Sequence, residues 1–112
     1  MLKAGNYDVL IYQDEAGHCP YVDWLNSLDW KMRERILARA ARMKQGQFGD
    51  FKALGDDLYE LRLFFGPGYR VYFGEDQGMA VLILAGGDKS TQRKDIKDAK
   101  KYWQLYLENQ DG

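Results

Sequence analysis

The chain has 112 residues, of which 46% are hydrophobic and 29% are charged. This length and composition are typical of a folded domain with its own core, so residues 1–112 are expected to form a single domain, and a disordered chain is excluded. No segment approaches the roughly 18 consecutive apolar residues of a membrane helix, and no secretory cleavage site follows the first residues. With Cys19 as its one cysteine, the chain fits a reducing compartment. We therefore expect a cytoplasmic protein.

The net charge of −1 conceals a segregation of basic residues along the chain. Residues 31–52 contain seven lysines and arginines against two acids, and residues 86–103 are basic again. Such segregation indicates a basic surface that could meet an anion, although the sequence pI of about 5.8 is unlike that of a general nucleic-acid binder.

Taken in chain order, the first half predicts a strand within residues 7–14, a short helix over 20–28 and a longer helix over 30–45. Pro20 suits the first turn of a helix. Ser27 or Asp29 can cap the second helix, and Gly46 can end it. Residues 46–57 are rich in glycine and aspartate and are expected to form turns.

The second half predicts three strands, at residues 58–65, 69–73 and 79–85, and then a helix capped by Ser90. The last strand is apolar throughout, which is typical of a central strand covered on both faces. The final helix carries an apolar stripe at helical spacing: Ile96, Ala99, Trp103 and Tyr106. The expected fold is α+β, with element order β-α-α-β-β-β-α and an antiparallel sheet whose helices pack on one face.

Arginines on two neighbouring strands are expected to share the sheet face outside the core. Successive side chains of a strand point to opposite faces, so Arg62 lies on the face opposite the apolar Leu61 and Leu63. A three-residue loop at 66–68 pairs Arg62 with Tyr72 and brings Arg70 to the same face, whereas a four-residue turn separates them. We prefer the three-residue loop because it keeps the apolar side chains together.

Further residues could join this face. Glu60 follows the same alternation as Arg62, Lys89 enters at one rim, and Lys52 could enter from the preceding loop. Arginines beside aromatic rings suit phosphate contact and base stacking. In the alternative interpretation Arg62 and Glu60 simply pair with neighbours, and Tyr72 is half-buried.

The segment GGDKSTQRKDIKDAKKYW, residues 86–103, joins the last strand to the last helix. Two glycines allow a sharp turn, and the helix N-terminus favours an anion. Lys89, Arg93 and Lys94 are unfavourable beside that positive end of the helix dipole. A purely structural role for this segment, as a turn followed by a helix cap, therefore explains the glycines and Ser90 but not these three cations.

With these residues placed, the combination ELR…GPGYRVYF…GGDKSTQ..DI..A resembles the RelE/ParE superfamily of type II toxins, and more narrowly its phage-derived, HigB-like addiction module killer proteins. The resemblance implies a RelE-like fold and an endoribonuclease that cuts mRNA on the ribosome. It implies no metal and no other cofactor. It also implies neutralisation by a small helix-turn-helix antitoxin.

The resemblance carries roles onto particular residues. Arg70 and Lys89 correspond to phosphate-contacting cations, and Arg62 to a recurrent arginine. The residues implied to contact RNA are Lys52, Tyr72, Gln92, Arg93 and Tyr102. Neither a general acid nor a general base is assigned, since no tyrosine lies in residues 86–96 and His18 is distant in sequence.

Two other functions remain open from the sequence. One is a ParE-like poison of DNA gyrase, which need not cleave RNA. The other is a non-catalytic module of the same fold that binds an antitoxin through its basic face. The oligomeric state is left open.

Overall fold

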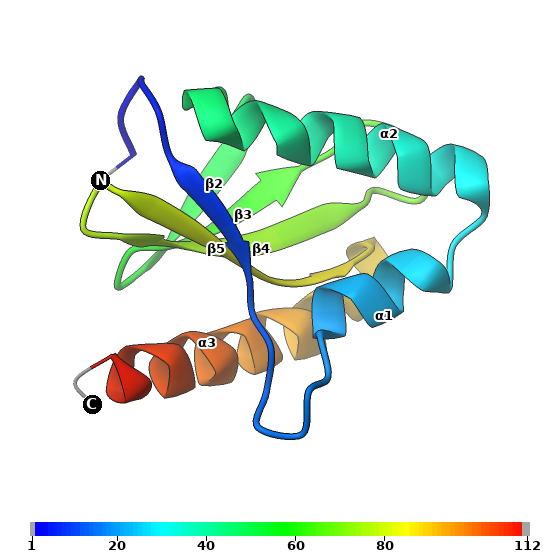
Figure 1. Ribbon diagram of the computed structural model, residues 1–112. Coiled ribbons are helices and arrows are strands. Elements are labelled where there is room, and N and C mark those ends of the chain that lie inside the picture. Colours follow the sequence, from blue (N-terminus) through cyan, green and yellow to red (C-terminus); the bar gives the residue numbers. More distant parts are fainter. Residues whose placement is uncertain (1, 111–112) are drawn as a thin grey trace.

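The structure, a computed structural model that describes residues 2–110, is built around a five-stranded sheet (Figure 1). In spatial order its strands are β1 (Asp8–Ile11), β5 (Ala80–Gly87), β4 (Arg70–Asp76), β3 (Leu58–Arg62) and β2 (Phe51–Gly55). β1 pairs with β5 in parallel, and the other neighbours are antiparallel. The predicted α+β class with a mainly antiparallel sheet is confirmed.

Two helices and a 3-10 turn cover the first face of the sheet: α1 (Pro20–Asn26), α2 (Trp30–Ala41) and η1 (Arg42–Gln45). The Asp29 carboxylate accepts a hydrogen bond from the Met32 amide at 3.1 Å, so Asp29 caps α2 as expected. Gly46 ends η1 with φ of 74°. A β carbon there would lie 2.8 Å or less from the backbone of Gly5 and Lys3, which explains the glycine.

The third helix, α3 (Gln92–Asn109), packs on the opposite face of the sheet from α2 (Figure 1). Its predicted stripe faces the sheet: Ala99 and Trp103 are 0% and 2% exposed, and Ile96 and Tyr106 are partly buried against the same core. The expectation that all helices share one face is therefore wrong. The reason lies in β5, where Val81 faces the first core and Leu82 faces the second, so both faces need cover.

A strand occupies part of the segment expected to form turns. Residues 51–55 form β2, which pairs with β3 and opposes Lys52 to Glu60. β2 is mostly exposed and has no alternation of apolar and polar residues. Its strand conformation therefore depends on pairing with β3 and could not be predicted from its own sequence. Asp56 and Asp57 connect the two strands, both with positive φ, the conformation that matches the twist of a tight hairpin.

The β3–β4 connection is longer than the preferred three-residue loop. Arg62 pairs with Arg70, and Glu60 pairs with Tyr72, so the register differs by two residues from the one expected. Because the shift is even, every side chain keeps its face, and the shared face is confirmed. The expectation that this face lies outside the core is wrong, because Leu58 and Tyr72 on it pack in the second core, under α3. Among residues 2–110, no helix is long and apolar enough to cross a membrane.

Candidate functional site

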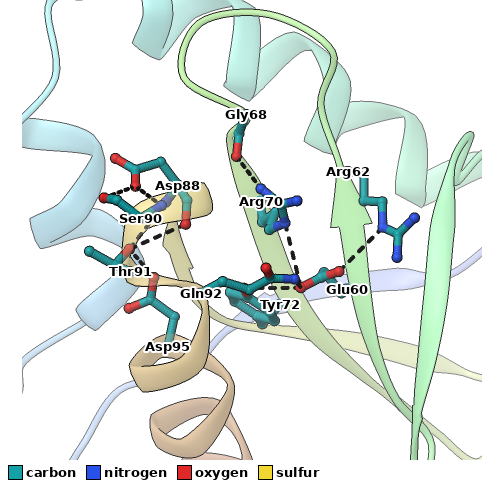
Figure 2. Close-up of polar contacts among 10 residues, drawn as sticks. All are labelled: Glu60, Arg62, Gly68, Arg70, Tyr72, Asp88, Ser90, Thr91, Gln92 and Asp95. Atoms are coloured by element: carbon teal, nitrogen blue, oxygen red, sulfur yellow. Dashed lines mark hydrogen bonds and ion pairs between the residues drawn. The ribbon is translucent and has the colours of Figure 1, made fainter.

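A buried carboxylate lies at the centre of the predicted basic face (Figure 2). Glu60 in β3 has no exposed side-chain surface. Its Oε1 accepts from Arg62 Nε at 3.3 Å, and its Oε2 accepts from Tyr72 Oη at 3.1 Å and from Gln92 Nε2 at 2.9 Å. Arg70 Nε lies 3.7 Å from Oε2. We call these five residues the Glu60 cluster.

Strand register brings the cluster together. Glu60 lies opposite Tyr72 on one side and opposite Lys52 on the other, while Arg62 lies opposite Arg70. Side chains that oppose one another across strands lie about 5 Å apart and on the same face. Lys52 is exposed on the edge strand, at the rim of the cluster.

The guanidinium of Arg70 is held at two points. Its Nη1 donates to the Gly68 carbonyl at 2.6 Å, and its Nε faces Glu60 (Figure 2). The side chain is 15% exposed. Gly68 has a φ of 79°, and a β carbon built on it would lie 3.2 Å from Arg70 Nη1 and 3.5 Å from Lys89 Cβ. Arg70 and the exposed Lys89 therefore flank the same glycine.

The start of the last helix is capped differently from the prediction. Asp88, not Ser90, is the N-cap residue of η2 (Lys89–Thr91), because Asp88 has extended backbone and its carboxylate accepts from the Ser90 amide at 2.8 Å. The Ser90 hydroxyl also donates to this carboxylate and lowers the pKa of Asp88. A negative group thus stands at the beginning of the helix, beside Lys89.

Two acidic groups, one in the cluster and one in α3, have raised pKa values. Burial, together with the charge of Glu60, raises the pKa of Tyr72, so Tyr72 remains a neutral hydroxyl donor. Burial also raises the pKa of Asp95 in α3, opposed by the hydrogen bond from the Thr91 hydroxyl. Tyr72 has no exposed surface, whereas Asp95 is half-buried.

The remaining residues implied to contact RNA fall into different places. Tyr72 is 0% exposed, which leaves its ring no surface on which a base could stack. Arg93 is exposed in the first turn of α3. Tyr102 stacks on Tyr12 with ring centres 5.0 Å apart, and it lies ten residues from Gln92, about 15 Å along the helix. The structure therefore gathers Lys52, Arg62, Arg70, Lys89 and Gln92, and leaves Tyr102 apart.

Two features went unrecognised in the sequence. Glu60 was expected only as a neighbour of the arginines, whereas it is their shared partner; its place in ELR, two residues before Arg62, was the available signal. The second is that the basic segment of residues 31–52 meets Arg62: Arg35 and Arg39 of α2 and Arg42 of η1 line one cleft with it. No local pattern joins that helix to β3.

The fold and the cluster define a small α+β protein with cations ordered around a buried carboxylate. The family model "Phage derived protein Gp49-like (DUF891)" matches residues 23–106, a range that contains the whole cluster. An uncharacterized protein of Haemophilus influenzae is 49% identical over 78 residues, which cover 69% of this chain and 79% of that protein. The chain belongs to the phage-derived Gp49-like family. Its expected place in a phage-derived group is thereby confirmed.

Proposed function

We propose that this protein is the toxin of a type II toxin–antitoxin module, of RelE/HigB type, and that it cleaves mRNA on the ribosome without a metal ion. The observation that carries the proposal is the pairing of two cations at one glycine: Arg70, fixed between Gly68 and Glu60, and the exposed Lys89. The phage-derived family supports a role in an addiction module.

In this reaction a ribose 2′-oxygen attacks the adjacent phosphorus, and the bond from phosphorus to the 5′-oxygen breaks. The 2′-hydroxyl loses its proton, and the leaving oxygen gains one. Negative charge accumulates on the non-bridging oxygens in the transition state, where preorganised cations stabilise it most. Arg70 and Lys89 would supply that stabilisation. Neither proton transfer is assigned to a side chain.

Glu60 acts through other residues in this scheme. Its side chain has no exposed surface, so it cannot reach a substrate. Its role is to orient Arg62 and Arg70, whose guanidinium groups would otherwise sample several rotamers. Glu60 is therefore a positioning residue.

The proposed partner that silences the protein is a helix-turn-helix antitoxin. An acidic segment of such a partner would pair with the cations at the rim of the cluster and block access of RNA. Lys52 and Lys89 are exposed there, and Arg93 is exposed in the first turn of α3; none of the three has a charge partner within 4.0 Å among residues 2–110.

The test is the mapping of new 5′ ends on a defined mRNA in a cell-free translation system. We expect Arg70→Lys and Lys89→Ala to lower cleavage about 100-fold, the loss typical of one missing transition-state donor. Arg70→Lys keeps a charge near Glu60, and circular dichroism would confirm that both variants fold. Lys101→Ala, an exposed lysine elsewhere on α3, is the matched control and should cleave like the wild type.

Cleavage by both variants at the wild-type rate would overturn the site assignment. Intact mRNA with the wild-type protein would overturn the proposed activity. In that case a supercoiling assay decides whether DNA gyrase is the target.

A further inference from the structure

A second basic feature lies beside the Glu60 cluster, between α2 and the loop that joins β3 to β4. It is a cleft of about 400 Å³ with these lining residues: Arg35, Ala38, Arg39, Arg42, Arg62, Phe64 and Phe65. Arg62 belongs to both features, since its Nε donates to Glu60 while its side chain lines the cleft. The cleft and the Glu60 cluster thus meet at Arg62.

Arg62 is paired with Glu60, but the other three arginines of this cleft have no ion-pair partner among residues 2–110. Arg35, Arg39 and Arg42 follow a spacing of four and three residues, which places them on one side of α2 and η1. Within residues 2–110, no carboxylate oxygen lies within 4.0 Å of a guanidinium nitrogen of these three arginines. Burial and the charge of Arg42 lower the pKa of Arg39. Like charges crowded at this spacing oppose helix stability, so an anion bound there would relieve them.

Aromatic rings complete the cleft. Phe64 is 85% exposed, the most exposed of the large hydrophobic side chains among the described residues. The guanidinium carbon of Arg35 lies 3.9 Å from the centre of the Phe65 ring, so the rim already holds an arginine against an aromatic face. Arginines beside an accessible ring match single-stranded RNA, whose phosphates contact the cations while an unpaired base stacks on the ring. A duplex, whose bases are already stacked, could not use Phe64.

We propose that this cleft binds the backbone of single-stranded RNA next to the phosphate held at Arg70, with one base stacked on Phe64. The inference rests on the proposed function for the identity of the strand, and it adds a binding subsite that α2 contributes. Arg62, shared by the cleft and the cluster, links the two parts of the path.

The experiment measures binding of a fluorescent 2′-O-methyl RNA of about 12 nucleotides, within the usual size of single-strand sites, to the full-length protein by anisotropy at several salt concentrations. The methyl groups prevent cleavage by blocking the attacking oxygen. Arg35→Gln with Arg42→Gln should weaken binding at least tenfold and reduce the salt slope by about two. Phe64→Ala should weaken binding about tenfold with an unchanged slope, since stacking carries no charge.

The matched control is Lys97→Gln with Lys101→Gln, which removes the same charge from exposed positions on α3. Equal losses in the control and in the cleft variants would overturn the subsite, because the effect would then be general electrostatics. Unchanged RNA binding by the cleft variants, together with weakened binding of a poly-glutamate peptide, would assign the cleft to an acidic protein instead.

The two proposals fail separately. If the wild type cleaves mRNA, Arg70→Lys does not, and the cleft variants bind and cleave normally, only the subsite is wrong. If the wild type neither binds nor cleaves RNA, the proposed function itself is wrong.

Discussion

Glu60 accepts hydrogen bonds from three different side chains although none of its own side chain is exposed. A carboxylate buried in this way is tolerated only when it is paired and hydrogen-bonded, because the loss of hydration is otherwise too large. The dependence is mutual, since Arg70 Nε is buried, has no hydrogen-bond partner among residues 2–110, and faces the Glu60 carboxylate as its ion-pair partner at 3.7 Å. The stability of this region and the position of the arginines thus depend on one negative charge.

Replacement of that charge should be costly. Glu60→Gln places an amide N–H₂ where an oxygen accepted hydrogen bonds, and it leaves Arg70 beside a neutral group. We expect the free energy of unfolding to fall by about 3 kcal/mol, as when a buried ion pair loses one partner. Urea denaturation measures this, with the exposed Glu34→Gln as control, expected to change stability by about 0.5 kcal/mol or less. A similar small change in Glu60→Gln would show that the cluster is not held by charge.

At the scale of elements, glycines set how closely the helices approach the sheet. Trp24 of α1 lies against Gly86 of β5, and Trp103 of α3 lies against Gly74 of β4. A β carbon on Gly86 would be 2.1 Å from the Trp24 ring. These contacts bury a large ring against bare backbone on each face of the sheet, which a longer side chain would prevent.

Gly74→Ala tests this arrangement. The new methyl group would lie 2.4 Å from the Trp103 ring, which is 2% exposed and donates its indole N–H to the Asp56 carbonyl at 2.7 Å. The ring has little room to move, so we expect a loss of about 2 kcal/mol in unfolding free energy. The smaller side chain of Trp103→Leu should relieve the clash, so the double variant should lose less than the sum of the two single variants. Strict additivity in this cycle would contradict the proposed contact.

Over the whole molecule, two cores share one sheet, and tyrosines lie in both of them. Tyr7 and Tyr21 belong to the first core, and Tyr106 packs against the second. The pKa of each is raised to about 12, chiefly by burial; for Tyr7 and Tyr106 the hydrogen bonds with Glu75 and Asp76 are part of the cause. Since β5 contributes to both cores, we expect the two to unfold together.

This predicts an alkaline transition. The folded-state pKa values exceed the unfolded value near 10, so the folded state binds these protons more tightly. The contribution to stability is therefore complete below about pH 10 and is lost as the pH rises from 10 to 12. Tyrosinate absorbance and the helical circular dichroism signal should change together. Tyrosinate that forms well before the dichroism changes would contradict the link between ionisation and unfolding.

Tyr21→Phe serves as the variant for this experiment. The Tyr21 hydroxyl is buried and has no hydrogen-bond partner among residues 2–110. Its removal should preserve or raise stability at pH 7 and should move the alkaline midpoint upward. A downward shift would show that the hydroxyl has a stabilising partner after all.

The sequence by itself determined the features that depend on neighbouring residues. Alternation in ELR and YRV placed Glu60, Arg62 and Arg70 on one face, and this survived a register shift because the shift was even. Helical spacing identified the stripe of α3, and Asp29 was one of the two predicted caps of α2. The motif combination indicated a phage-derived family, which the family match confirms.

Tertiary structure alone decided what depends on segments far apart in the chain. β2 forms because β3 offers it a pairing partner, which brings Lys52 opposite Glu60. Gln92 reaches Glu60 across 32 residues, and the docking of α2 brings its arginines to Arg62. Tyr72 was predicted to be accessible to a base, but it is buried because α3 covers that face of the sheet. Local periodicity specifies which side of an element is apolar, whereas the partner that covers that side is chosen by the packing of the whole chain.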